Sequence, residues 1–351
     1  MDSAQLLALV GALRGRRVAV IGDVVADEFV YGRIARVSRE APVLILEYDS
    51  TEIVPGGAGN AANNVASLGG TAALAAVVGR DEPGQRLLRA LHKRVDPRRV
   101  TRAAGRPTPV KTRILAGGIH SAKQQVVRID RSVANGFDDR ARATFERQAI
   151  AACAGADAVL VSDYGSGLVT PAVVRRVRAS IDGGIPILID TRHKLLDYRG
   201  LTACTPNESE VEQALGVRIN DNLRVLEQAG RELLERTRMR AVLITRGSRG
   251  MALFVKGAPT LHIPIYGSDE IADVTGAGDT VMATMALALA AGATFELAAR
   301  LANYAGGLVV MKRGTATVSA AELLTAVRNE GRGRADVRRG RALARPGQRR
   351  G

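Results

Sequence analysis

The segment Asp273–Thr280, DVTGAGDT, brings three small residues next to a carboxylate at the start of an apolar stretch, VMATMALALAAG. Glycine in a helix costs about 1 kcal/mol relative to alanine, so Gly276 and Gly278 predict a loop-to-helix junction. Backbone N–H groups of Gly276, Ala277 and Gly278 could form an anion hole there for a transferring phosphoryl group. Asp279 could take a proton from a hydroxyl held at that point. An ordinary helix start whose aspartate complements the helix dipole is the alternative, and in either case we expect this helix start to be exposed.

A second glycine-rich segment, VPGGAGNAANNVASLGG, precedes another stretch of small residues with helical character. Gly56 and Gly57 would let the backbone approach a ligand closely, and Asn60 adds an amide donor and acceptor. A glycine-rich turn followed by a helix cap would give the same pattern. The chain contains no GxxxxGK[ST] motif, so a P-loop fold is not expected.

Short apolar runs rich in β-branched residues alternate with segments of helical periodicity along most of the chain. The runs are Arg16–Asp23, Asp157–Asp163, Ile185–Asp190 and Arg240–Gly247. This alternation predicts an α/β fold, with a mostly parallel central sheet and helices on both of its faces. Asp23, Asp163 and Asp190 end three of these runs. Because ligands bind beyond the carboxyl ends of such strands, we expect the site there.

Two segments interrupt the alternation of strands and helices. Val43–Ile53 alternates like a strand, and Val110–Asp130 predicts two strands around a Gly117-Gly118 turn. Together they predict a small β-sheet, with strands within about 28–54 and 108–131, attached to a single domain over residues 1–330. This sheet could cover a substrate as a lid, close a dimer, or do both.

The chain of 351 residues has a net charge of +15, but its last 21 residues hold eight arginines against one aspartate. Aromatic residues make up 3% of the chain, and none lie between these arginines as stacking platforms would. We interpret residues 331–351 as a basic, solvated and disordered tail, and expect no specific nucleic-acid partner. A weak contact with a polyanion or a membrane surface stays open.

The cysteine content and the hydropathy of the chain favour a cytoplasmic location. Cys153 and Cys204 give neither a disulfide framework nor a metal-binding spacing. The N-terminal segment is too short and too acidic for a signal peptide. No apolar run reaches the length of about 18 residues that a membrane span needs.

Three motifs in order resemble the ribokinase family of carbohydrate kinases. They are GGAGN (Gly56–Asn60), the NxxE element within TPNESE (Asn207–Glu210) and DVTGAGDT (Asp273–Thr280). The resemblance runs from about Arg16 to Ser319. It implies a ribokinase-like fold with a β-sheet lid, transfer of a phosphoryl group from ATP to a sugar hydroxyl, and use of Mg²⁺. It leaves use of K⁺ open and implies a homodimer.

Within this family, the chain is most similar to the branch of D-glycero-β-D-manno-heptose-7-phosphate kinases. The segments that carry this similarity are IGDVVADEFVYGRIARVSREAPVLILE, ASLGG and SDYGSG. The resemblance implies phosphorylation of the anomeric O1 to the 1,7-bisphosphate, on the route to ADP-heptose and lipopolysaccharide. The chain has no HxGH nucleotide-transfer motif, so it resembles the kinase-only form.

The chain departs from this branch at two positions. Ser166 and Arg192 lie in segments where the branch usually has a lysine, and Arg192 or Lys194 could supply the lost charge. A kinase for another sugar or sugar phosphate is therefore an alternative, as is a catalytically inactive protein with this fold.

The resemblance also implies roles for individual residues. Asp279 would be the catalytic base, and the amides of Gly276, Ala277 and Gly278 would stabilise the phosphoryl charge. The residues expected to bind the sugar substrate are Asp27, Gly56, Gly57, Asn60, Lys111, Arg113 and Arg128. Those expected to bind ATP are Asn207, Glu208, Ser209, Glu210, Thr245, Gly247, Gly250 and Asn303.

Two further expectations concern ions and the lid. Glu210 would organise Mg²⁺ through water, and Asp273 and Thr275 fall where relatives bind a monovalent cation such as K⁺. Lys111 and Arg113 are alternate residues of a predicted strand, so they share a face and could point together at a sugar phosphate. Solvent-facing strand charges are the alternative reading.

Overall fold

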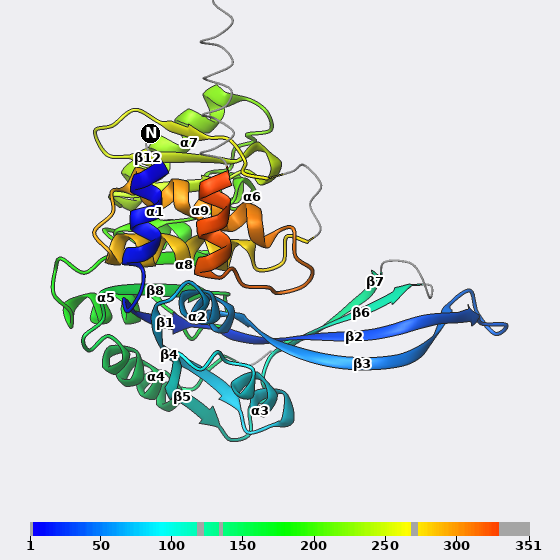
Figure 1. The fold of residues 1–351 in the computed structure, drawn as a ribbon. Helices are drawn as coiled ribbons and strands as arrows, with labels where there is room; N and C mark the ends of the chain where they lie inside the picture. The colour runs from blue at the N-terminus through cyan, green and yellow to red at the C-terminus, as the bar shows by residue number, and fades with distance from the viewer. Residues whose placement is uncertain (1–2, 118–122, 133–135, 268–272, 330–351) are drawn as a thin grey trace, which may run out of the picture.

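The structure is a computed structural model that describes residues 3–117, 123–132, 136–267 and 273–329. The predicted tail, residues 331–351, lies outside these ranges, as does Gly118 of the predicted turn. Within the described residues, a nine-stranded sheet forms the centre of the body and a four-stranded sheet projects from it (Figure 1).

The central sheet has the order β13-β12-β11-β10-β9-β8-β1-β4-β5. Its strands are parallel except β12 and β13, which are antiparallel to their neighbours. This confirms the predicted mostly parallel sheet. The bounds are β1 (Arg17–Gly22), β4 (Thr71–Gly79), β5 (Val95–Ala103), β8 (Ala158–Asp163), β9 (Ile187–Thr191), β10 (Ala203–Cys204), β11 (Ala241–Thr245), β12 (Met251–Val255) and β13 (Leu261–Ile263).

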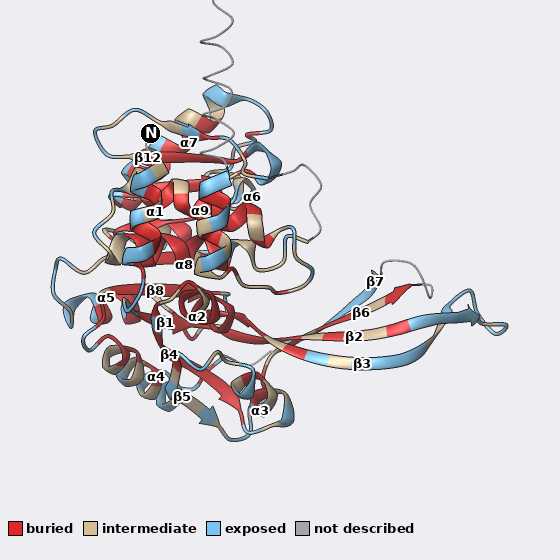
Figure 2. Ribbon diagram, viewed as in Figure 1, coloured by how far each residue is buried: buried red, intermediate tan, exposed pale blue. Residues whose placement is uncertain are grey.

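Helices cover both faces of this sheet because successive strand residues point to opposite sides. Val18 and Val20 of β1 pack into one core, and Ala19 and Ile21 into the other. The first face carries α1 (Ser3–Ala12), α2 (Ala58–Ser67), α8 (Ala277–Ala290) and α9 (Phe295–Val309). The second carries α4 (Asp139–Ala152), α5 (Pro171–Ala179), α6 (Glu208–Leu215) and α7 (Leu223–Thr237). Both cores are buried (Figure 2).

Three shorter elements also belong to the body. Helix α3 (Glu82–Arg89) contacts β2, β3 and β4 near the base of the projecting sheet. Two 3₁₀ turns, η1 (Leu195–Asp197) and η2 (Gly247–Arg249), follow β9 and β11. Each turn lies beyond the carboxyl end of a parallel strand, where ligands of α/β sheets bind.

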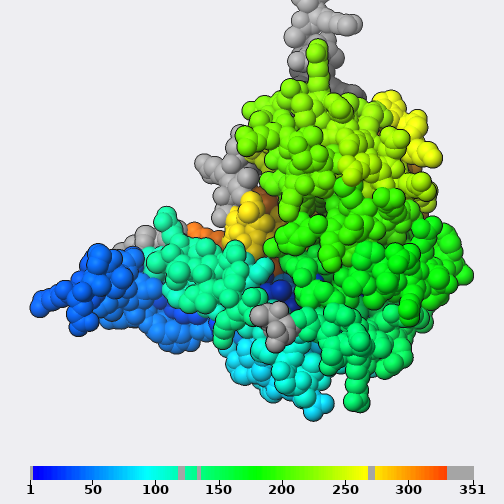
Figure 3. Space-filling view, turned by 180° about the vertical axis from the view of Figure 1, so that it is seen from behind, coloured from blue at the N-terminus to red at the C-terminus, as the bar shows by residue number. Residues whose placement is uncertain are grey.

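The projecting sheet, which we call the lid, has the order β3-β2-β6-β7. Its strands are β2 (Val24–Val37), β3 (Leu44–Gly57), β6 (Val110–Gly117) and β7 (Gln124–Arg131). Strand β2 runs antiparallel to β3 and parallel to β6. Strand β7 is exposed along its whole length, and the lid stands away from the body when seen from behind (Figure 3). Only Asp23 separates β1 from β2, so Asp27 lies near the start of a lid strand.

The order of the central sheet reverses at β1. On one side of β1 in the sheet lie β4 and then β5. On its other side lie β8, β9, β10 and β11, in that order. Crevices at such switch points, beyond the carboxyl ends of the strands, bind ligands in α/β sheets. Asp23 follows β1, Asp163 ends β8, and the lid leaves the body at the same place.

Candidate functional site

Two cavities formed by described residues meet at the carboxyl ends of the central strands. The sheet cavity, of about 360 Å³, includes Asp190, Glu210, Thr245, Gly278, Asp279 and Asn303 in its lining. The lid cavity, of about 310 Å³, includes Asp23, Arg106, Lys111, Arg128, Phe137 and Ser166. Tyr164 and Arg192 line both cavities, so the two are adjacent.

The start of helix α8 forms one wall of the sheet cavity. Its N-cap residue, Gly276, has a φ of 77°, a left-handed conformation that favours glycine. A Cβ at Gly276 would lie 2.5 Å from Asn60 Nδ2, whereas one at Gly278 would meet no atom within 4 Å. The Ala277 amide already donates to the Val274 carbonyl at 3.2 Å. The Ala277 amide therefore already has a backbone partner, and the anion hole at Gly276, Ala277 and Gly278 stays a prediction.

Asp279, in the first turn of α8, is 4% exposed, so the expectation of an exposed helix start was wrong. Its Oδ2 accepts a hydrogen bond from Asn60 Nδ2 at 2.8 Å, and its Oδ1 accepts one from the Tyr164 hydroxyl at 3.1 Å. Burial raises the pKa of Asp279 to about 6, although both hydrogen bonds favour the charged form. A carboxylate with this pKa is suited to accept a proton near neutral pH.

Asp27 lies on the lid strand β2 and is also buried. Its carboxylate accepts hydrogen bonds from Arg113 Nη1 at 2.6 Å and from Thr315 Oγ1 at 3.0 Å. A Cβ at Gly56 would lie 2.3 Å from Asp27 Oδ2, and one at Gly57 would lie 2.5 Å from a backbone oxygen. Gly56 therefore lets β3 pass close to the Asp27 side chain, and Gly57 lets it pass close to the Asp23 backbone.

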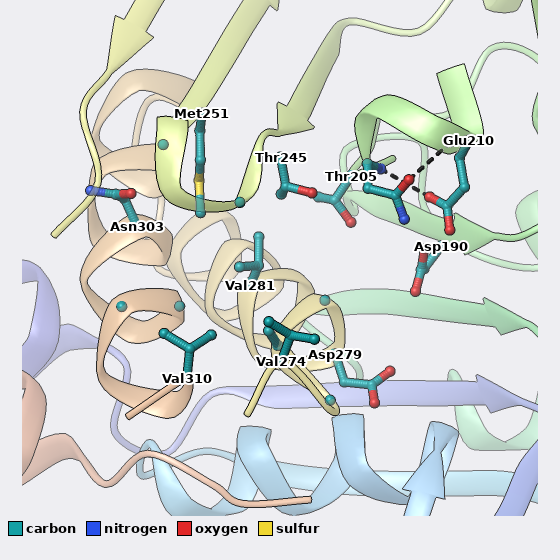
Figure 4. A pocket seen from close by; sticks show the side chains of 18 of the residues that line it. Asp190, Thr205, Glu210, Thr245, Met251, Val274, Asp279, Val281, Asn303 and Val310 are labelled. Carbon is teal, nitrogen blue, oxygen red and sulfur yellow. Dashed lines mark hydrogen bonds between the residues drawn. The ribbon is translucent and has the colours of Figure 1, made fainter. Parts of the chain in front are cut away.

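Two carboxylates, Asp190 and Glu210, face the sheet cavity from the same side (Figure 4). Glu210 and Asn207 form a capping box at the start of α6, with two hydrogen bonds of 2.9 Å. No described residue donates a hydrogen bond to the Asp190 carboxylate. Desolvation and the neighbouring Glu210 raise the pKa of Asp190 to about 8, and desolvation also raises that of Glu210.

This pair of carboxylates is suited to a divalent cation. Mg²⁺ is usually held by one or two carboxylates together with substrate phosphates. In the described ranges, no group of three or more His, Cys, Asp or Glu side chains could hold a metal by itself. A metal here would therefore need the phosphates as further ligands. From the sequence alone, Asp190 was identified only as a carboxylate at the end of a predicted strand. That place at the strand end was the one signal of a possible role in the site.

Some of the other residues expected to bind ATP line the sheet cavity, and some do not. Thr245, Gly247, Gly250 and Asn303 line it, and Asn303 Nδ2 donates to the Pro264 carbonyl at 2.9 Å. Glu208 and Ser209 are outside the lining residues of both cavities. The Glu208 carboxylate instead pairs with Arg246 at 2.7 Å and with Arg249.

The two residues expected to bind K⁺ shape the loop before α8. Asp273 accepts hydrogen bonds from the amides of Thr275 and Gly314, both at 2.9 Å. Neither Asp273 nor Thr275 is among the residues that line the two cavities. Asp273 therefore ties this loop to the segment around Gly314, and the monovalent-cation site stays a prediction.

The lid cavity is rich in cations. Those lining it are Arg106, Lys111, Arg128, Arg131 and Arg192. Arg128 pairs with Asp130 and Arg131 with Glu28, each at 2.8 Å. The Lys111 ammonium lies 5.6 Å from the centre of the Tyr164 ring. Arg113 was expected beside Lys111 at a sugar phosphate, but it is outside the lining and forms its ion pair with Asp27.

Ser166, which stands where the heptose-7-phosphate kinases usually have a lysine, also lines the lid cavity. Its hydroxyl donates to Asp23 Oδ1 at 2.5 Å, and the Tyr164 amide donates to Asp23 Oδ2 at 2.9 Å. Asp23 therefore fixes the loop that carries Tyr164. Sequence reasoning assigned no role to Tyr164, although it lies inside the quoted SDYGSG motif, and none to Arg106 or Thr315.

Comparisons with known proteins agree with this geometry. The model of the pfkB family of carbohydrate kinases matches residues 16–322. The bifunctional protein HldE of Trichlorobacter lovleyi is 39% identical over 335 residues, which are 95% of this chain and 67% of that protein. HldE of Geobacter sulfurreducens is 42% identical over 310 residues, 87% of this chain and 61% of that protein. The chain thus spans about two thirds of the length of these relatives.

Solved structures share the fold. Arabidopsis thaliana ribokinase, complexed with ribose and ATP, has a TM-score of 0.66 at 21% identity, covering 90% of this chain and 99% of that one. Escherichia coli phosphofructokinase-2, in complex with potassium, has a TM-score of 0.70 at 17% identity, with the same coverage. The fold is therefore ribokinase-like, and the family match and the identity to HldE extend over most of the chain. The chain belongs to the pfkB family of carbohydrate kinases.

Proposed function

We propose that this kinase transfers the γ-phosphoryl group of ATP to the anomeric O1 of D-glycero-β-D-manno-heptose 7-phosphate. The product would be the 1,7-bisphosphate, for ADP-heptose and lipopolysaccharide synthesis. The observation that carries the proposal is the meeting of the two cavities at Tyr164, whose hydroxyl bonds to Asp279. ATP would occupy the sheet cavity, and the cations of the lid cavity would hold the 7-phosphate. The heptose-kinase motifs and the identity to HldE proteins support this substrate.

The transfer needs one base and one anion site. Asp279 would take the proton of the O1 hydroxyl as that oxygen forms a bond to the γ-phosphorus. The bond from this phosphorus to the oxygen bridging to the β-phosphate breaks, and ADP leaves. Amides at Gly276 and Gly278 and the positive end of α8 would stabilise the charge on the transferring group. Asp27, held by Arg113 and Thr315, would orient sugar hydroxyls.

Members of this family use ATP together with a divalent metal, and we infer that Mg²⁺ is the metal here. Asp190 and Glu210 would hold it, because they are oxygen ligands on one wall of the sheet cavity. Bound there, Mg²⁺ would neutralise charge on the ATP phosphates. We also propose K⁺ near Asp273 and Thr275. Turnover that is equal in K⁺ and in Na⁺ buffers would argue against the K⁺ site.

We propose further that the lid closes a homodimer. Its outer parts expose large apolar side chains, which favour burial against a second surface. The most exposed are Val37 at 59%, Val43 at 55%, Tyr48 at 67% and Ile129 at 50%. Sedimentation velocity would test this, and a monomer at micromolar concentration would contradict it.

A cytoplasmic location is part of the same proposal. Cys153 and Cys204 are both free and buried, as is usual for a protein of a reducing compartment. Among the helices formed by described residues, none has both the length and the apolar character to cross a membrane.

The proposed reaction can be tested with purified protein, ATP, Mg²⁺ and a panel of sugars. Heptose 7-phosphate should be consumed with ADP release, and ³¹P NMR should show a second phosphate ester on the anomeric carbon. Ser166, bonded to Asp23 where the branch usually has a lysine, favours the alternative of another sugar phosphate. If the protein phosphorylates only a different sugar or sugar phosphate, heptose 7-phosphate is not its substrate. If it phosphorylates no sugar of the panel, the alternative of a catalytically inactive binding protein is favoured.

A further inference from the structure

Arg192 lies at the boundary between the sheet cavity and the lid cavity and lines both. It follows β9 directly, and its backbone N–H donates to the Asp163 carbonyl at the end of β8, at 3.3 Å. Its guanidinium carbon lies 4.3 Å from the centre of the Tyr164 ring, and the hydroxyl of that tyrosine bonds to Asp279 at 3.1 Å. One side chain therefore separates this guanidinium from the catalytic base.

The charge of Arg192 acts on groups in both cavities. Desolvation is the largest influence on the pKa values of Asp190, Asp279 and Lys111, and the Arg192 charge lowers each of them. The two aspartates line the sheet cavity, whereas Lys111 lines the lid cavity. The field of this guanidinium thus reaches both sides of the boundary.

The side chain of Arg192 is available to a ligand. Two other arginines of the lid cavity, Arg128 and Arg131, are held by carboxylates at 2.8 Å. No ion pair of Arg192 exists among the residues that the structure describes, and the residue is exposed. A guanidinium offers five N–H donors in a planar fork that binds two phosphoryl oxygens in a fixed bidentate geometry, whereas an ammonium group lacks this fork.

We propose that Arg192 is a catalytic residue whose guanidinium binds the phosphoryl group as this group passes from the sheet cavity to the lid cavity. This inference rests on the proposed function, since it places ATP and the acceptor in those two cavities. The Arg192 fork holds oxygens of the transferring phosphoryl group while the acceptor oxygen bonds to phosphorus and the bond to ADP breaks. The acceptor proton goes to Asp279, and Arg192 stays protonated throughout.

The rival role for Arg192 is to hold only the phosphate that the sugar already carries. The two roles differ in kinetics, because a contact made in the transition state changes kcat, whereas uniform binding of the acceptor changes its KM. Arg192→Gln should lower kcat by about 10²- to 10³-fold, as loss of one preorganised donor does, with KM values close to wild type. Arg192→Lys should recover part of this loss, because it keeps the charge without the fork.

A binding measurement can test the role of Arg192 without knowing which sugar the enzyme phosphorylates. ADP with aluminium fluoride imitates the transferring phosphoryl group and should bind to the wild type more tightly than ADP alone. The Arg192→Gln variant should bind ADP with the same affinity as the wild type. It should lose most of the increase in affinity that aluminium fluoride gives to the wild type. Because this probe needs no sugar, it gives a result even if heptose 7-phosphate is not the substrate.

Lys194→Gln is the matched control, because Lys194 is an exposed cation two positions along the chain and lines neither cavity. It should leave kcat and the aluminium fluoride effect unchanged. An Arg192→Gln enzyme with normal kcat and a raised KM for the sugar phosphate would overturn the inference in favour of the rival role. An unchanged gain from aluminium fluoride would overturn it as well.

Discussion

The sheet cavity and the lid cavity are both suited to phosphate groups, but they use opposite chemistry. The sheet cavity presents Asp190, Glu210 and Asp279 beside the glycine-rich start of α8. A triphosphate can bind beside these carboxylates only with a metal ion and backbone amides as partners. The lid cavity presents arginine and lysine side chains, which bind a monophosphate directly. This difference supports the proposal that ATP binds in the sheet cavity and the sugar phosphate in the lid cavity.

The two cavities also differ in how they are built. The sheet cavity lies on elements of the nine-stranded sheet and its helices, whereas the lid cavity takes residues from both sheets. Asp279 and Tyr164 connect them at the switch point of the central sheet.

Asp279→Asn should lower kcat by about 10²- to 10⁴-fold, since it removes the base. The substitution is nearly isosteric, and the new amide oxygen can still accept from Asn60, so we expect the fold and sugar binding to persist. Paired turnover and calorimetric titration with the sugar would measure this, with circular dichroism as the folding control. Turnover near the wild-type level would mean that Asp279 is only a helix cap.

Gly278→Val should lower turnover by about 10²-fold through misplacement of the phosphates. A side chain at this position meets no protein atom within 4 Å and would extend into the sheet cavity. Gly276→Ala is the contrasting variant, because its Cβ would collide with Asn60 in a left-handed conformation. It should instead lower the free energy of unfolding, by about 1–2 kcal/mol. Equal effects of both variants on stability would contradict this reading of the two glycines.

Tyr164→Phe should move the acid limb of the pH–rate profile to higher pH. Asp279, with a pKa of about 6, is active when ionised, so turnover should fall as the pH drops through this value. The Tyr164 hydroxyl favours the ionised form, as Asn60 and Arg192 do, whereas burial and Asp27 oppose it. Losing that hydroxyl raises the pKa of Asp279, so turnover should fall by up to about tenfold below pH 6 but change little at pH 8. An unchanged profile would show that the bond to Tyr164 does not tune the base.

Truncation after Asn329 should change neither folding nor turnover, because the basic tail is interpreted as a solvated extension. Thermal unfolding and kcat of the shortened chain would be compared with those of the full chain. A large fall in kcat, or salt-sensitive nucleic-acid binding that vanishes with the tail, would show that this interpretation is wrong.

The sequence predicted those parts of the molecule that depend on local patterns. Alternation of apolar runs with helical segments predicted the central sheet, and period-two alternation predicted the lid, because both patterns reflect neighbouring residues. The start of α8 was predicted for the same reason, from glycines in DVTGAGDT.

Contacts between distant positions could not be predicted in this way. Arg113 pairs with Asp27 across 86 positions, and Thr315 bonds to Asp27 across 288. Asp279 is buried because Asn60, 219 positions away, packs onto its carboxylate. A strand pattern predicts the face of the sheet on which a side chain lies, but not the residue that this side chain contacts. This is why Arg113 was expected to bind the sugar phosphate together with Lys111.

The measurement that tests the division between the two cavities most directly is the preference for a phosphorylated sugar. The ratio of kcat/KM for heptose 7-phosphate to that for unphosphorylated heptose would be compared between the wild type and Lys111→Met. A charge-assisted contact contributes about 1.5–3 kcal/mol, so the ratio should fall by about 10- to 100-fold, through KM for the phosphorylated sugar, with KM for ATP unchanged. An unchanged ratio, or a raised KM for ATP, would contradict the assignment of the lid cavity to the sugar phosphate.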